Sequence, residues 1–331
     1  MRNALRFALG VAVGGGGVAA YLLVVGVDDV AERALAVAPP VLAAVAALVV
    51  AESIADGIGV WASVRPLRGG LSPCRSVQFA FAGDFFDTLS PAGPVSSEPI
   101  LAQFVGTATD TSYSDALGVR TAAKYLKTGT QLLVSTALAA AVLAGDPDAT
   151  PVLLALGSVV ALLAVATAVA LRSRAVATRA LVALLAPPLA RLPRRSLDRA
   201  GTTAAVERFL DRLFRFRSAP RLVALIALGG VLEQALAAGT LWVALAGTGA
   251  TVPLLPLVAL MPLPQAASVV PVPASLGAYD GLLSGGLVLA VGVPVAAAAA
   301  AVLVVRTVSL LFWLAAGGVA AALLRGWRPG G

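Results

Sequence analysis

Histidine is missing from this chain of 331 residues, and cysteine occurs once, at Cys74. Without histidine, a catalytic triad of serine and histidine is impossible, and the commonest proton shuttle and metal ligand is lost. A single cysteine excludes an internal disulfide and a metal cage built from cysteines. The sequence therefore predicts no metal site and no cofactor, and it gives little support to an enzyme.

Charge is scarce as well. Only 12% of the residues are charged, whereas soluble domains carry about 25%. Hydrophobic residues make up 59%, and the mean hydropathy is +0.92. Several apolar runs exceed the roughly 20 residues that cross a bilayer as a helix. These properties predict an all-α, polytopic membrane protein.

Six segments are long and apolar enough to be full spans, namely 4–26, 34–64, about 118–144, 151–171, 222–248 and about 295–324. Basic residues flank one set of ends, whereas acidic segments at 27–33 and 145–150 flank the other. The positive-inside rule then places both termini and the 172–221 loop in the cytoplasm. The first apolar run lacks a convincing cleavage site, so we expect it to remain as a span in the cell membrane.

Six full spans agree with this orientation only if two further regions do not cross the membrane. These regions, about 76–115 and about 254–293, must return to the side from which they came. The first is broken at Ser90-Pro-Ala-Gly-Pro94 and the second at Pro271-Val-Pro273. Irregular backbone inside a membrane must be buried in protein or line a polar cavity. We therefore predict two re-entrant helical hairpins. The alternative is two ordinary short spans joined by a proline-rich turn outside the membrane.

The order of two spans, a hairpin and a span occurs twice, in about 4–146 and in about 151–324, starting from opposite faces. This order predicts one transmembrane domain built as an inverted repeat, whose paired broken segments mark a midplane binding site. Local matches support it: Pro91–Glu98 with Pro273–Asp280, Arg120 with Arg306, and Glu52–Trp61 with Glu233–Trp242.

Glu98, Asp280 and Arg306 are charges at membrane depth, where a charge marks a candidate functional site. The planar fork of arginine matches phosphate oxygens, so we predict that Arg306 binds a phospholipid or polyprenyl-phosphate head group. The alternative is that an ion pair of Arg306 with Asp280 or Glu98 only locks a hairpin to a helix. The half-helix ends after each break add free N–H groups that favour anions, which brings the breakers into the predicted site: Pro91, Gly93, Pro273 and Gly277, together with Arg120.

Other features are weaker signals. Glu52 and Asp56 lie on one face of the second span, and Glu233 lies in the fifth. In one interpretation these acids line a polar path or carry protons. In the other, they pair with arginine or serine side chains inside the bundle. Asp84 and Asp87 are expected to face the aqueous mouth of the first hairpin. We interpret Gly14–Gly17 as a site of close helix packing.

The 172–221 segment contains twelve arginines against three acids. Thr202 and Thr203 are predicted to cap an amphipathic helix with Val206, Leu210 and other apolar residues on one face. Such a basic helix is suited to an anionic lipid leaflet. The alternative is a solvated linker that only obeys the positive-inside rule. We expect no nucleic-acid binding, because no recognition fold accompanies the charge.

Three stretches resemble a known family. Leu89-Ser-Pro-Ala-Gly-Pro-Val-Ser-Ser-Glu98 resembles the first Pro-x-Gly…Glu motif of the lysylphosphatidylglycerol synthase transmembrane family, which is flippase-like. Val272-Pro-Ala-Ser-Leu-Gly-Ala-Tyr-Asp280 resembles its second motif, Pro-x-Gly-Gly-Leu-Gly-x-x-Glu. Ser275 replaces the second glycine and Asp280 replaces the glutamate. Val305-Arg-Thr-Val-Ser-Leu-Leu-Phe-Trp313 resembles its arginine-bearing last helix.

The resemblance implies a bilayer-embedded domain that moves or holds lipids, as in bacterial lipid-aminoacylating proteins. Archaeal relatives are linked to glycosylation on polyprenyl-phosphate carriers. The bacterial synthases append a soluble catalytic domain, and because this chain ends at Gly331 we expect no aminoacyl transfer from it. The leading hypothesis is a flippase-like protein that binds or translocates an anionic phospholipid or a lipid-linked sugar phosphate. The alternative is a non-transporting membrane partner of a glycosyltransferase or lipid-modifying enzyme.

Overall fold

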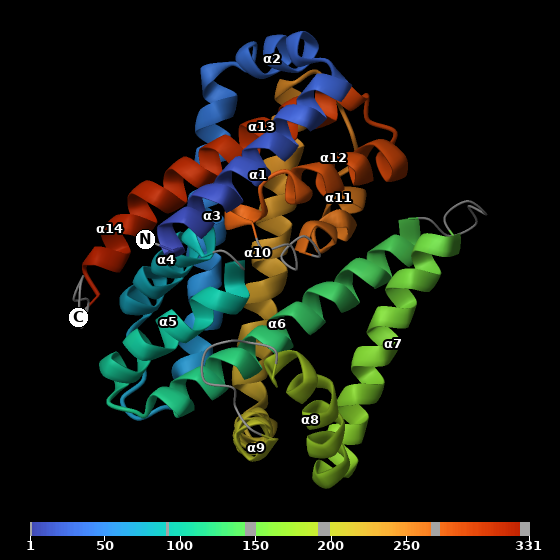
Figure 1. The fold of residues 1–331 in the computed structure, drawn as a ribbon. Coiled ribbons are helices and arrows are strands. Elements are labelled where there is room, and N and C mark those ends of the chain that lie inside the picture. Colours follow the sequence, from blue (N-terminus) through green and yellow to red (C-terminus); the bar gives the residue numbers. More distant parts are fainter. Residues whose placement is uncertain (1, 91–92, 143–149, 191–198, 266–271, 325–331) are drawn as a thin grey trace.

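The structure is a computed structural model that describes the chain except residues 1, 91–92, 143–149, 191–198, 266–271 and 325–331. Every regular element in the described part is a helix, which confirms the all-α prediction (Figure 1). Three helices in this part are long and apolar enough to cross a membrane: α3 (Pro39–Val64), α10 (Pro220–Gly247) and the continuous run of α13 and α14 (Val295–Ala322). The chain is therefore a helical membrane protein.

Helices also occupy the other three predicted spans: α1 (Arg2–Val25), α6 (Tyr113–Val142) and α7 (Thr150–Arg172). The second predicted span begins later than expected, because the acidic segment forms a helix of its own, α2 (Val27–Leu35), and α3 starts at Pro39. Proline is favoured at a first helical position because the N–H that it lacks has no partner there. The total of six full spans stays a prediction.

Short helices lie where the two hairpins were predicted. In the first half, α4 (Pro73–Leu89) and α5 (Gly93–Thr109) have 17 residues each and pack against one another. In the second half, α11 (Leu254–Leu260) and α12 (Ala278–Val291) flank the short 3-10 turn η3 (Pro273–Ser275). All are shorter than the roughly 20 residues of a typical span. Whether each pair re-enters from one face, and whether the halves form an inverted repeat, stay predictions.

The helices α3 and α10 form the centre of the molecule and share its most extensive helix contact. They meet at glycines, since a Cβ atom on Gly229 would lie 3.0 Å from the backbone nitrogen of Gly59. Small residues let membrane helices approach closely enough to pack backbone on backbone. The close approach of the two helices therefore depends on the absence of a side chain at Gly229.

Two apolar cores adjoin this central pair. The first joins α3 to α4, α5 and α6 and includes Phe79, Phe86 and Leu101. The second joins α10 to α11, α12 and α13 (Val295–Phe312) and includes Leu257 and Leu287. Each pair of short helices thus packs into one of the two cores. This packing fixes α4 against α3 and α11 against α10.

The last long helix contains one turn of π-helix, η4 (Trp313–Gly317), between α13 and α14 (Gly318–Ala322). A Cβ atom on Gly317 would lie 2.5 Å from the carbonyl oxygen of Phe81 on α4, and the Phe81 and Phe312 rings meet edge to face at 5.2 Å. The π-turn therefore lies where α4 packs most closely on this helix.

The helices α8 (Arg174–Ala190) and α9 (Arg199–Arg217) form a basic hairpin. The prediction that Thr202 and Thr203 cap the amphipathic helix is wrong, because α9 begins at Arg199. Val206 and Leu210 are buried, 4% and 1% exposed, in a core shared with α8. The apolar face of α9 is therefore used for packing within the protein, which leaves its charged face for the outside.

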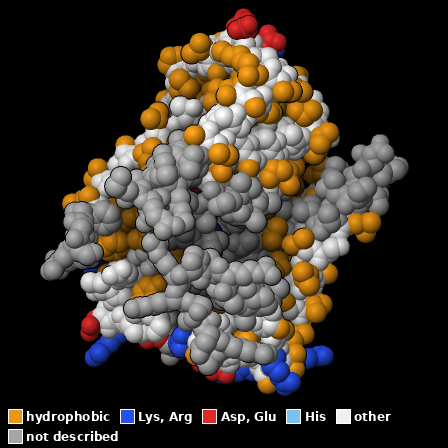
Figure 2. All heavy atoms as spheres, viewed as in Figure 1, with side chains coloured by type: hydrophobic (Ala, Val, Ile, Leu, Met, Phe, Trp, Pro, Cys, Tyr) orange, Lys and Arg blue, Asp and Glu red, His pale blue; other side chains and the backbone are white. Residues whose placement is uncertain are grey.

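The surface separates charge from apolar area. Figure 2 shows acidic side chains at the end formed by α2, basic side chains mixed with some acids at the opposite end near α8 and α9, and hydrophobic side chains between them. This distribution agrees with a membrane-spanning orientation. The prediction of close helix packing at Gly14–Gly17 is wrong for Gly15, Gly16 and Gly17, where an added Cβ would meet no described atom within 4 Å.

Candidate functional site

Arg306 and Asp280 form the centre of the second broken segment. Nε of Arg306, on α13, donates to Oδ1 of Asp280, in the first turn of α12, over 3.1 Å. Nη2 of Arg306 donates to the carbonyl oxygen of Ala274 over 2.5 Å, and the guanidinium carbon lies 4.4 Å from the centre of the Tyr279 ring. Oδ2 of Asp280 accepts the backbone N–H of Gly277 over 2.9 Å. Arg306 is thus bound by groups of this chain, and Asp280 also caps α12.

The turn before α12 is left-handed at three positions. Ala274, Ser275 and Gly277 have φ angles of +54°, +51° and +79°. Such a backbone costs a residue with a side chain roughly 1–2 kcal/mol, whereas glycine tolerates it. The three positions coincide with the glycines of the resembled motif. The motif therefore specifies a backbone shape, which Ala274 and Ser275 keep at an energetic cost.

Glu98, on α5, forms the corresponding pair in the first half. Its Oε1 accepts from Nη2 of Arg120 over 2.9 Å, and its Oε2 from Nε of Arg120 over 3.1 Å. Such two-pronged, charge-assisted contacts are among the strongest hydrogen bonds in proteins. Lys124, one turn further along α6, donates to Oε1 over 3.2 Å. In both halves, an acid of the second short helix therefore holds an arginine of the next long helix.

The sequence left two partners open for Arg306, and the structure selects Asp280. Glu98 binds Arg120 and Lys124 instead. Of the breakers in the predicted site, Gly93 begins α5, Pro273 begins η3 and Gly277 precedes α12, whereas Pro91 lies outside the described residues.

Lys127 joins α6 to both central helices. Its Nζ lies 2.7 Å from Oδ1 of Asp56 on α3 and 2.6 Å from Oε2 of Glu233 on α10. A Cβ atom on Gly230 would lie 2.7 Å from Cγ of Lys127, so the glycine leaves room for the lysine stem. Asp56 and Glu233 therefore pair inside the bundle, but with a lysine and not with the arginine or serine partners that we expected.

Sequence reasoning did not single out Lys124 or Lys127. A signal was present, because Arg120, Lys124 and Lys127 follow one another at helical spacing inside a predicted span. Side chains at such spacing lie on one face of a helix. Three cations on one face of a membrane helix need acidic partners nearby. This pattern could have indicated a buried polar centre.

Carboxylates outnumber cations in this centre. Asp84 accepts a hydrogen bond from Oγ of Ser53 over 2.7 Å, and Asp87 accepts one from Ser97 and lies 3.9 Å from Nζ of Lys124. The two acids of the first hairpin are therefore engaged with side chains of the bundle. Glu52 forms no hydrogen bond or ion pair with another described residue. The charged groups gathered near α6 are Glu52, Asp56, Asp84, Asp87, Glu98 and Glu233, with Arg120, Lys124 and Lys127.

Exposure divides these ion pairs into two kinds. The pairs Arg306–Asp280 and Arg120–Glu98 are nearly sealed, because their side chains are only 9% to 14% exposed. Lys124 is 33% exposed and its partner Asp87 is 31% exposed, whereas Lys127 is 20% exposed and its partners Asp56 and Glu233 are 22% exposed. A charge that faces lipid is costly. The open pairs at these positions therefore point to a polar space that water reaches.

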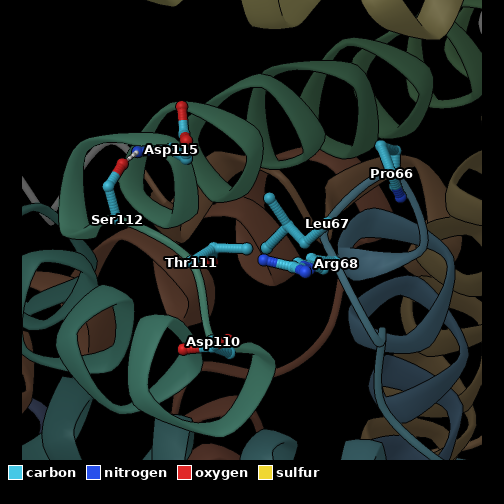
Figure 3. Close-up of a pocket in the computed structure, with 7 residues that line it drawn as sticks. All are labelled: Pro66, Leu67, Arg68, Asp110, Thr111, Ser112 and Asp115. Carbon is cyan, nitrogen blue, oxygen red and sulfur yellow. Dashed lines mark hydrogen bonds between the residues drawn. The ribbon is translucent and has the colours of Figure 1, made fainter.

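A separate pocket of about 390 Å³ lies at the turn between α5 and α6. Figure 3 shows Leu67 and Arg68, from the loop after α3, opposite Asp110 and Thr111. Ser112 caps α6 by accepting the backbone N–H of Asp115 over 3.1 Å. The pocket contains none of the ion pairs of the polar centre and mixes one arginine with two acids.

These features define the class of this chain as a helical membrane protein with ion pairs at the broken segments and partly exposed ion pairs beside α6. The chain belongs to the family of the lysylphosphatidylglycerol synthase TM region, whose model matches residues 7–317. The resemblance found in the motifs is thereby confirmed, and the family places the chain among membrane proteins of lipid metabolism or transport. No curated protein and no solved structure matches the chain in the comparisons made.

Proposed function

We propose that this protein binds the head group of an anionic phospholipid or a polyprenyl-phosphate-linked lipid and translocates it across the cell membrane. The observation that carries the proposal is the partial exposure of Lys124 and Lys127 inside a bundle of membrane helices. Lysine is an established phosphate ligand that acts as a point charge. Both lysines are held by carboxylates that a phosphate replaces when the lipid enters.

The two broken segments support a transport role. Each half has an acid of its second short helix bound to an arginine of the next long helix, Glu98 to Arg120 and Asp280 to Arg306. Equivalent pairs on broken helices are expected of an inverted repeat, in which two halves rock around a central site. In this proposal both termini lie in the cytoplasm, and the nearly sealed pairs hold the broken segments while the halves move.

The excess of carboxylates in the polar centre limits which charge state of the substrate can bind. A phosphate adds negative charge to a centre that already has more acids than cations, and like charges close together are unfavourable in a low dielectric. We therefore expect the anionic head group to enter together with a proton. The protein itself is expected to perform no chemical reaction on the lipid.

The test uses the purified protein in liposomes that contain a trace of lipid labelled on its head group, with the label quenched from outside. Phosphatidylglycerol and a polyprenyl phosphate are the anionic probes, and phosphatidylcholine is the control. We expect the protein to speed the loss of fluorescence of at least one anionic probe at least tenfold over protein-free liposomes. Rates equal to those of protein-free liposomes for every anionic probe contradict the proposal.

The alternative, a non-transporting partner of a glycosyltransferase or lipid-modifying enzyme, makes a different prediction. Such a partner co-purifies with an enzyme whose activity survives neutralisation of Lys124 and Lys127. Co-purification followed by an assay of that enzyme in the variants separates the two functions.

A further inference from the structure

One face of α6 carries a continuous row of polar side chains. Its members are Arg120, Lys124, Lys127, Gln131 and Ser135, at positions i, i+4, i+7, i+11 and i+15 of the helix. Residues at this spacing share a helix face. At 1.5 Å per residue the row is about 22 Å long. The helix α6 packs against α3 and α10, so the row lies inside the bundle. A single ion pair does not account for five polar side chains there.

The partners of the row change from one half of the protein to the other. Arg120 binds Glu98 on α5, and Lys124 lies between Glu98 and Asp87 on α4. Lys127 then bridges the central helices α3 and α10. The row therefore begins at the first pair of short helices and reaches the centre of the molecule.

The second part of the row reaches the other pair of short helices. Nε2 of Gln131 donates to the carbonyl oxygen of Gly230 over 3.0 Å, and Gln265, beyond α11, donates to Oε1 of Gln131 over 3.5 Å. Oγ of Ser135 accepts from Gln234, whose Nε2 also donates to the carbonyl oxygen of Val258 on α11. One face of α6 thus connects the two broken regions by side-chain and backbone hydrogen bonds. Figure 1 shows α6 running across α10 between α5 and α7.

We infer that the part of this face from Lys124 to Lys127 is the track of the lipid phosphate, with the two lysines as successive binding positions. The inference rests on the proposed function and names the residues that carry it out. Lys127 is suited to exchange because one ammonium group holds two carboxylates. It releases Asp56 or Glu233 to bind a phosphate oxygen and keeps the other acid, so the lysine never lies unpaired in the membrane.

The two lysines lie three residues apart, about 4.5 Å along the helix axis. A phosphate bound to Lys124 is therefore within reach of Lys127 without leaving the row. Beyond the lysines, Gln131 and Ser135 are buried and hydrogen-bonded to α10, so the phosphate positions end at Lys127.

The decisive experiment separates phosphate binding from simple locking of the helices. A single Lys127→Met change leaves two acids without their cation, so loss of activity alone has two explanations. The triple variant Lys127→Met, Asp56→Asn and Glu233→Gln removes all three charges together. Replacing a complete buried ionic group by neutral side chains is often tolerated. We expect the triple variant to keep the melting temperature of the parent in detergent, and its lipid translocation in liposomes to fall at least tenfold.

Lys124→Gln is the second variant, and it is independent of the triad. We expect it to fold as the parent and to lower translocation at least tenfold, because Glu98 keeps Arg120 as a partner. The matched control is Arg174→Gln with Asp211→Asn, which removes an exposed ion pair between α8 and α9. The control is expected to translocate lipid at the rate of the parent.

The outcomes distinguish failure of the proposed track on α6 from failure of the proposed transport function. If the parent translocates lipid and the triple variant does so at the same rate, Lys127 only locks α3, α6 and α10, and the track is refuted at that position. If Lys124→Gln is also fully active, the track is refuted altogether while the transport function stands. If the parent itself translocates no anionic probe, the proposed function fails.

Discussion

Nε of Arg306 lies 3.1 Å from Oδ1 of Asp280, and both side chains are nearly sealed from solvent. The two residues are 26 positions apart in the chain and join α13 to the start of α12. Removal of one partner from a buried ion pair leaves an uncompensated charge, which typically costs about 3–5 kcal/mol. This pair is therefore expected to hold the broken segment against the last long helix.

Arg306→Ala tests that role. We expect the free energy of unfolding to fall by about 3–5 kcal/mol, because Asp280 loses its cation and the carbonyl group of Ala274 loses its donor. Unfolding of the purified protein in mixed micelles by increasing amounts of denaturing detergent measures the change. Arg306→Lys is the control, since it keeps the charge but cannot donate to both acceptors in the same geometry. Equal stability of Arg306→Ala and the parent would contradict a locking role.

Ser275→Gly should stabilise the protein. The left-handed backbone at Ser275, with φ +51°, costs a serine more than a glycine. Glycine also makes the unfolded chain more flexible, which offsets part of the gain. The net expectation is about 0.5–1 kcal/mol of added stability. The control is Ala290→Gly, an exposed residue near the end of α12, which should instead cost about 0.5–1 kcal/mol. Equal effects of the two changes would show that the turn is not strained.

Gly229→Leu should disrupt the central pair of helices. A Cβ atom at this position already lies 3.0 Å from the nitrogen of Gly59, and overpacking typically costs about 1–3 kcal/mol. The control is Gly239→Leu on the same helix, where an added Cβ meets no described atom within 4 Å. We expect a lower melting temperature for the first variant and little change for the second. A Gly229→Leu protein as stable as the control would mean that α3 and α10 separate easily.

Cys74 provides a reporter of orientation, because it is the one cysteine of the sequence and is exposed at the start of α4. With both termini in the cytoplasm, a thiol reagent that cannot cross membranes should label Cys74 in inside-out vesicles and leave it unlabelled in intact cells. The matched reporter is Cys74→Ser with Asp29→Cys, which moves the thiol to α2 at the acidic end. The opposite labelling pattern is expected there, and labelling of both reporters from one side refutes the orientation.

Much of the fold could be predicted because local sequence dictates it. Long apolar runs specify membrane helices, and prolines end them, so the long helices and both broken regions fall close to the predicted places. The boundary at Pro39 and the start of α9 were missed. The acidic segment 27–33 looked like a connection, and Thr202 looked like a cap, although each lies within a helix. Helical propensity of short charged segments is weak, and tertiary contacts such as that of Val30 with Ala299 and Ala300 decide it.

The candidate site was predictable only in part. The motifs pointed to Glu98, Asp280 and Arg306, which all lie in ion pairs, yet these are the nearly sealed pairs. Lys127 was missed because its partners Asp56 and Glu233 are 71 and 106 residues away in the sequence. No local sequence pattern predicts contacts between residues so far apart.

By itself the sequence determined that this protein is a helical membrane protein with two broken regions, since hydrophobicity and backbone breakers act over a few residues. Its motifs also pointed to the family that the chain belongs to. Only the tertiary structure decided which acidic side chain pairs with which basic side chain. Pairing depends on how α3, α6 and α10 cross and on how much water reaches each side chain. Those crossings separate the nearly sealed Arg306–Asp280 pair from the open lysines of α6.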